Sequence, residues 1–163
     1  MGMVVYLREV SPAQITELTQ NPSNWEQFAF EEAAPGELVD VDKAWHALHF
    51  MLTETSGPTD SPLNILSPSD DLYGADEHGF GGFSLVSPSE MKAFSVALSE
   101  LTDQAIAARY DPAAMVAEDI YLGDSFADEG DEGLTYIMQG IPDLRLFANR
   151  CAANGSGAFN ILS

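Results

Sequence analysis

Basic residues are scarce in this chain. Its 163 residues include 6 Lys and Arg against 26 Asp and Glu, which gives a formal net charge of -20. A field of that sign repels phosphate backbones and anionic lipid headgroups over about 8 Å, the Debye length at physiological salt. The composition therefore argues against nonspecific nucleic-acid binding and against docking on an anionic membrane, and it favours attraction to basic proteins.

Cysteine and long apolar runs are also scarce. The single Cys151 cannot form an internal disulfide, which suits a reducing compartment. Its apolar neighbours Phe147 and Ala152 indicate a core residue rather than a nucleophile. No run reaches the roughly 18 apolar residues that span a bilayer, and the first ten residues lack the basic start and apolar segment of a secretory leader. We therefore expect a cytoplasmic protein.

The established catalytic and nucleotide-binding motifs are missing as well. The chain has no G-x-S-x-G, H-E-x-x-H, C-x-x-C, P-loop or G-x-G-x-x-G spacing. The tripeptide Gly123-Asp124-Ser125 resembles the start of a serine-esterase block, but no histidine follows His78 to serve as its base. No cofactor is evident from the sequence. The acids and histidines of the chain could, however, ligate a divalent metal.

Helix starts are easy to locate. Ser-x-x-Gln or Ser-x-x-Glu capping boxes, in which the Ser oxygen accepts from the third helical N–H, predict three helices, and Asp-Pro predicts a fourth. A fifth helix is expected over 132–153, with a break near Gly140 and Pro142. The four predicted starts lie at Ser11, Ser23, Ser87 and Asp111.

Three apolar, β-rich runs at 3–7, 83–86 and 158–162 are the candidate strands. Strands and helices do not alternate strictly, so a βαβ fold is not indicated. The pattern predicts an α+β fold over residues 1–163, a single helix-rich domain in which a small sheet of about three to four strands packs against helices.

The stretch from Asp40 to Thr53 holds two of the three histidines, one of the two tryptophans and one of the two lysines. Its order of an acid, Lys43, Trp45, a Leu-His-aromatic step and a Leu-Thr end resembles the signature of the YfbM-like family of small bacterial proteins of unknown function. The resemblance extends over nearly the whole chain, through the Ser-Pro-x-Glu box and the Ile120-Tyr121 step. It implies a YfbM-like fold and no particular chemistry.

On a helical wheel, this stretch has an apolar stripe around Trp45 and a polar row along its edge. The row consists of Asp42, His46 and His49, at i, i+4 and i, i+3 spacing. Imidazoles beside a carboxylate suit general acid/base chemistry, so these three are the candidate catalytic residues. The alternative is structural: an acid in a first helical turn is favoured by the macrodipole, and edge histidines usually bond backbone carbonyls.

The same histidines could ligate a metal. One helix supplies at most two or three ligands, so the others would come from the long loop over 57–82. The candidate metal ligands are therefore His46, His49, Asp76 and His78, with Glu77 beside them.

Two hypotheses follow. The favoured one is a noncatalytic binding module whose acidic surface engages a basic protein, for example as an inhibitor or immunity-type factor. The other is a small hydrolase or metal-dependent enzyme built on Asp42, His46, His49 and the 70–78 loop. Residues 111–132 have eight acids and no base, and their default interpretation is a solvated loop, with a cation site or a basic partner surface as the alternatives. The overall acidity could likewise serve only solubility or adaptation to a salty cytoplasm. The oligomeric state stays open.

Overall fold

A mixed fold with one antiparallel sheet is seen in the computed structural model, which describes residues 2–67, 72–73 and 83–163. In these residues the strand order is β2-β1-β5-β4-β3, and every neighbouring pair is antiparallel. The strands are β1 Val5–Val10, β2 Leu38–Asp42, β3 Leu72–Tyr73, β4 Phe83–Val86 and β5 Gly157–Leu162.

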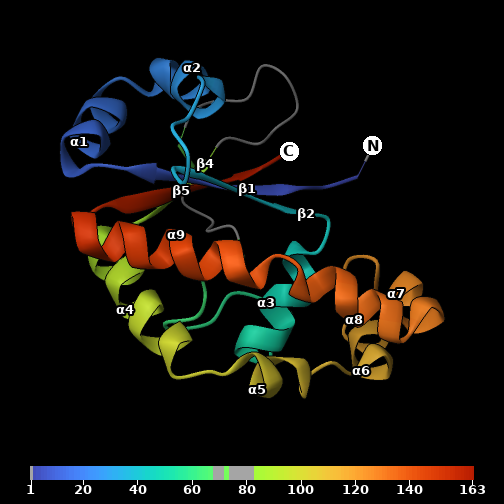
Figure 1. The fold of residues 1–163 in the computed structure, drawn as a ribbon. Helices are drawn as coiled ribbons and strands as arrows, with labels where there is room; N and C mark the ends of the chain where they lie inside the picture. Colours follow the sequence, from blue (N-terminus) through green and yellow to red (C-terminus); the bar gives the residue numbers. More distant parts are fainter. Residues whose placement is uncertain (1, 68–71, 74–82) are drawn as a thin grey trace.

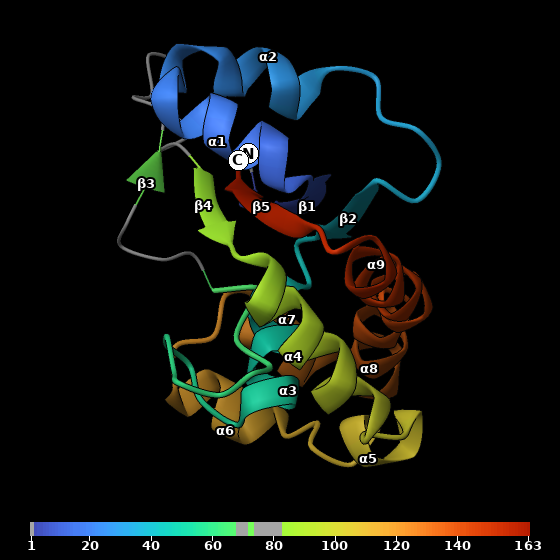
Figure 2. The ribbon, with the colours of Figure 1, turned by 90° about the vertical axis from the view of Figure 1, so that its left-hand side faces the viewer.

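Helices cover both faces of the sheet, so the fold has three layers (Figure 1). On one face lie α1 and α2, and on the other lie α3 to α9, as the second view also shows (Figure 2). The first group is α1 Pro12–Gln20, the 3₁₀ turn η1 Pro22–Asn24 and α2 Trp25–Phe30. The second group is α3 Trp45–Thr53, α4 Pro88–Ser99, α5 Asp103–Ala107, α6 Pro112–Ala117, α7 Gly123–Glu129, α8 Asp131–Met138 and α9 Ile141–Asn154.

Both faces of the central strands are buried. Val5 and Leu7 of β1 belong to the larger core beneath α3, α4 and α9, whereas Val10 belongs to the smaller core under α1 and α2. This arrangement follows from the period of a strand, in which successive side chains point to opposite faces. The layers explain how a chain of this size buries two apolar clusters with one small sheet.

Most of the predicted helix starts are confirmed. Ser11 and Ser87 form complete capping boxes with Gln14 and Glu90, and Asp111 accepts from the third helical N–H of α6. The break near Gly140 is also confirmed, since α8 ends at Met138 and α9 begins at Ile141. These signals are local hydrogen-bonding and steric rules, so the sequence shows them without tertiary information.

The prediction of a capping box at Ser23 is wrong. Ser23 lies inside the 3₁₀ turn, and α2 begins at Trp25 after Asn24, which makes no side-chain cap hydrogen bond. Pro22 opens this earlier turn, so the chain is already helical where Ser23 would have to adopt the extended conformation of a cap.

The α+β fold and the three expected strands are confirmed, and the described residues add β2 and β3. The structure contradicts the placement of Asp42 on a helix. Asp42 is the last residue of β2, with φ 50, and α3 starts only at Trp45. Val41 precedes Trp45 by four residues and therefore mimicked helical periodicity, but its buried side chain belongs to the alternating pattern of β2.

Candidate functional site

The two histidines of α3 hold the backbone that follows their helix. His46 Nε2 lies 2.7 Å from the carbonyl oxygen of Ser56, and His49 Nε2 lies 2.9 Å from that of Gly57. Tyr121 N donates to His46 Nδ1 over 2.9 Å. Because Nδ1 of His46 accepts, its Nε2 carries the hydrogen and donates it in a hydrogen bond to the carbonyl oxygen of Ser56. Both nitrogens of His46 are therefore engaged by backbone groups.

His49 is fully buried, and its Nδ1 has no hydrogen-bond partner among the described residues. Burial lowers the pKa of His49, the nearby His46 lowers it further, and the bond to Gly57 only partly opposes these effects. His49 is thus a neutral imidazole that donates to a carbonyl.

Asp42 does not join this pair. Tyr136 Oη of α8 donates to Asp42 Oδ2 over 2.6 Å. Burial first, and then the bond and charge of Asp42, raise the pKa of Tyr136 to about 12, so the phenol keeps its proton. The predicted row of Asp42, His46 and His49 is therefore not assembled on one helix: the histidines hold the turn after α3, and Asp42 ties β2 to α8.

The metal hypothesis depends on residues that the structure does not cover. Asp76, Glu77 and His78 lie outside the described residues. Within 2–67, 72–73 and 83–163, no group of three or more His, Cys, Asp or Glu could hold a metal ion. Metal binding by His46 or His49 with these acids stays a prediction.

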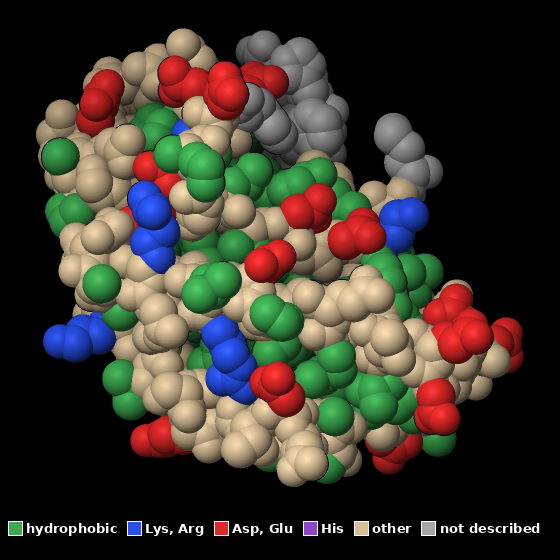
Figure 3. All heavy atoms as spheres, in the orientation of Figure 1, with side chains coloured by type: hydrophobic (Ala, Val, Ile, Leu, Met, Phe, Trp, Pro, Cys, Tyr) green, Lys and Arg blue, Asp and Glu red, His purple; other side chains and the backbone are tan. Residues whose placement is uncertain are grey.

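Acidic side chains gather at the end of the molecule formed by α6, α7 and α8. Figure 3 shows them over the right-hand end, where Figure 1 places these helices. Every acid between residues 111 and 132 is exposed. Among the described residues, none of them has a Lys or Arg within 4 Å. This surface, called here the acidic end, consists of Asp111, Glu118, Asp119, Asp124, Asp128, Glu129, Asp131 and Glu132.

The arginines do not neutralise the acidic end because they are bonded elsewhere. Arg109 donates to the carbonyls of Met51 and Leu52, at the end of α3. Arg145 of α9 donates to the carbonyl of Leu98 in the last turn of α4, to that of Leu101 just after it, and to the carboxylate of Asp103. A guanidinium suits such positions because its planar fork satisfies several acceptors at once.

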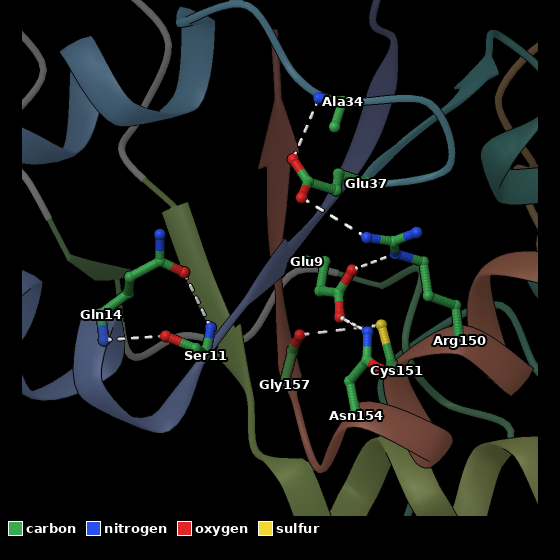
Figure 4. A network of polar contacts seen from close by, with 9 residues as sticks. All are labelled: Glu9, Ser11, Gln14, Ala34, Glu37, Arg150, Cys151, Asn154 and Gly157. Atoms are coloured by element: carbon green, nitrogen blue, oxygen red, sulfur yellow. Dashed lines mark hydrogen bonds and ion pairs between the residues drawn. The ribbon is translucent and has the colours of Figure 1, made fainter.

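A second charged cluster lies at the edge of the sheet (Figure 4). Arg150 Nε of α9 donates to Glu9 Oε2 over 2.5 Å, and Asn154 Nδ2 donates to Glu9 Oε1 over 2.8 Å. Arg150 Nη2 also reaches Glu37 Oε1 at 3.4 Å. Burial raises the pKa of Glu9, but the bonds from Asn154, Arg150 and Ser156 outweigh it and hold the pKa below its usual value.

Cys151 is buried next to this cluster, as its apolar sequence neighbours predicted. Burial, followed by the charge of Glu9, raises the pKa of its thiol to about 12. The thiolate is the nucleophilic form of cysteine, and the buried thiol of Cys151 stays protonated at neutral pH. Cys151 therefore serves as a core residue and not as a nucleophile.

Comparisons with known proteins agree with this fold. The profile of a domain of unknown function, DUF1877, matches residues 1–159. The chain belongs to this family. The solved structure of YfbM from Escherichia coli, described as a protein of unknown function, has a TM-score of 0.73 and 22% sequence identity over 98% of this chain and 99% of that chain. None of the curated proteins compared with the chain matches it.

The expected YfbM-like fold is therefore confirmed, and the family carries no assigned chemistry. No helix among the described residues of this DUF1877 member is long and apolar enough to cross a bilayer. Sequence reasoning had singled out the acids of 111–132 but missed the cluster at the sheet edge. Glu9 and Arg150 lie 141 residues apart, so only their opposite charges connect them in the sequence.

Proposed function

We propose that this protein is a noncatalytic binding module and that the acidic end engages a basic surface on a protein partner. One observation carries the proposal: eight exposed carboxylates within 22 residues have no Lys or Arg within salt-bridge distance in the described part of the chain. Exposed like charges destabilise a folded chain, so a surface of this kind suits binding better than stability.

The acidic end is a firm platform. Phe126 of α7 and Ile137 of α8 are buried in the larger core, and Tyr110 Oη donates to the carbonyls of Phe126 and Gly130 at 2.9 and 2.8 Å. The carboxylates are therefore presented by helices that are fixed to the core. A platform that is already ordered loses little conformational entropy when a partner binds.

The local structure also accounts for only a few of the carboxylates. Asp111 caps α6, and Glu118 accepts from Ser56 Oγ at 3.1 Å. The carboxylates of Asp128 and Glu129, by contrast, make no side-chain hydrogen bond or ion pair within the described residues. Their charges are free to steer a basic partner, since rim charges act mainly on association rate and specificity.

Affinity capture tests the proposal. The immobilised protein is exposed to native lysate at low salt, and we expect it to retain a discrete basic protein. Sodium chloride at about 0.5 M, where the Debye length is about 4 Å, should release that protein. A variant that neutralises four acids of the acidic end should fail to retain it: Asp124→Asn, Asp128→Asn, Glu129→Gln and Glu132→Gln.

A matched variant controls for net charge. It neutralises four exposed acids outside the acidic end and should retain the partner. Equal capture by the two variants, or no retained protein, would contradict the proposal. The control substitutions are Glu17→Gln, Glu32→Gln, Glu100→Gln and Asp143→Asn.

A further inference from the structure

A polar pocket of about 410 Å³ is lined by residues at the C-terminal end of β1. In Figure 1 this end of β1 lies on the opposite side of the molecule from α6, α7 and α8. Near the pocket, β1 pairs with β2 through Arg8 and Leu38, and Glu9 N donates to the carbonyl of Glu37 just before β2. Arg8 and Glu9 of β1, the start of α1 and the end of α9 contribute to its lining. Four charged side chains, two of each sign, share this pocket: Arg8, Glu9, Glu37 and Arg150.

The two carboxylates of the pocket are already satisfied. Glu9 accepts at both oxygens, from Arg150 and Asn154. Glu37 also accepts at both, from Arg150 and from the backbone N–H of Ala34. These acids therefore have little remaining capacity to bind a cation.

The donors of the pocket are only partly used. A guanidinium has five N–H groups. Nη1 of Arg8 donates to the carbonyls of Glu31 and Ala29, at 2.6 and 3.5 Å, while its Nε and Nη2 have no acceptor among the described residues. The same holds for Nη1 of Arg150 and for Nε2 of Gln14.

Arg8 is the unusual member of this set. It is 5% exposed, yet no carboxylate in the described part of the chain lies within 4 Å of its guanidinium. Its charge meets the ring of Phe28, 4.5 Å away, and the two carbonyls at the end of α2. A buried cation without a counter-ion is costly, so an anion that entered the pocket would gain from pairing with it.

The nitrogens of Arg8 that lack an acceptor keep access to the pocket. The polar side-chain atoms that are fully enclosed without a partner in the described residues lie elsewhere, on Trp45, His49, Asn64 and Asn160. The free donors of Arg8 are therefore not sealed in the core, and Arg8 is one of the residues that line the cavity.

We propose that this pocket binds a small carboxylate ligand, whose oxygens accept from the free N–H groups of Arg8. The planar guanidinium fork matches a carboxylate. A singly charged ligand also suits the surroundings better than a phosphate, because a net charge of -20 repels a dianion more strongly. The site is independent of the acidic end and of its protein partner.

An NMR titration of the protein with sodium acetate tests this site. Sodium chloride is varied to hold the ionic strength constant, and acetamide serves as the uncharged probe of the same shape. We expect acetate to cause saturable shifts in the Arg8 Nε–H signal and in the backbone amides of Ser11, Gln14 and Asn154, and we expect acetamide to cause none. Inorganic phosphate should bind more weakly than acetate.

The variant Gln14→Glu keeps the helix start, because Glu is a standard partner of Ser11 in a capping box. It adds a carboxylate to the pocket lining and should weaken acetate binding by about tenfold or more. Gln104→Glu makes the same charge change at an exposed position of α5 and should leave acetate binding unaltered. The proposal is overturned by shifts that do not saturate, by equal effects of acetamide, by tighter binding of phosphate, or by unchanged affinity in Gln14→Glu.

Discussion

At the edge of the sheet, Glu9 is held by Arg150 and Asn154, whereas at the acidic end eight exposed carboxylates have no Lys or Arg within salt-bridge distance among the described residues. The four arginines of the chain therefore lie where they join secondary-structure elements. Glu9 at the first place is bonded to Arg150 and Asn154 of α9, and the acids at the second place lack a basic partner among the described residues. Substitutions in the two regions should accordingly differ in kind.

The largest effect on stability is expected from Glu9→Gln. The side chain of Glu9 is 9% exposed, and a Gln amide has one acceptor oxygen where Glu9 has two, so Arg150 or Asn154 would face an NH2 group in place of its acceptor. We expect the free energy of unfolding to fall by about 1–3 kcal/mol in urea denaturation. Asp128→Asn at the acidic end is the control and should stay within about 0.5 kcal/mol of wild type. Equal losses in both variants would erase the contrast between the regions.

The pH dependence of stability should show the buried His49. Its pKa is lowered in the folded state, so the unfolded chain binds more protons at mildly acidic pH. Stability should therefore decrease as the pH falls below about 6.5, with a slope of at most about 1.4 kcal/mol per pH unit from this residue.

His49→Gln removes this titration and keeps a group that can donate to Gly57. Urea denaturation across the pH range should give a shallower decrease for the variant, whatever its stability at neutral pH. Parallel pH profiles for variant and wild type would show that His49 does not titrate as its burial implies.

Asp42 offers a contrast with the acidic end, because this exposed acid has a partner. Tyr136→Phe removes the donor of the 2.6 Å bond and leaves the ring packed against the core. We expect a loss of about 1 kcal/mol in thermal or urea unfolding. A loss below about 0.3 kcal/mol would place Asp42 with the unpaired carboxylates.

The smallest effect is expected at the acidic end itself. Asp128→Asn combined with Glu129→Gln should change the free energy of unfolding by less than about 0.5 kcal/mol, with a gain at low salt because like charges are removed. Unfolding in urea at low and high sodium chloride measures this. A loss above about 1 kcal/mol at low salt would show that these acids stabilise the fold.

Local signals in the sequence predicted much of this fold. The boxes at Ser11 and Ser87, the cap at Asp111 and the break before Ile141 each depend on a few neighbouring residues. The strand β2 was missed because Val41 and Trp45 fit a helical spacing as well as Val39 and Val41 fit a strand. Pairing with β1 decides between the two, and pairing is a tertiary interaction.

The candidate sites show the same limit. The two histidines were correctly placed on one helix, but the carbonyls of Ser56 and Gly57 that they bond could not be foreseen from spacing. The pocket around Arg8 and Arg150 was missed because its side chains come from segments that only the sheet and α9 bring together. The acidic end was visible in composition because its charges are contiguous in sequence.

In this account, the acids of the acidic end bind a basic partner through their position. The most direct test is to measure the affinity of the captured partner for two variants of equal net charge. One is the acidic-end variant and the other is the matched variant with neutralised acids elsewhere. Isothermal titration at several salt concentrations should show an affinity about tenfold or more weaker, and a shallower salt dependence, for the acidic-end variant alone. Equal affinities and equal salt dependences for the two variants would contradict the account, because the position of the charges would then not matter.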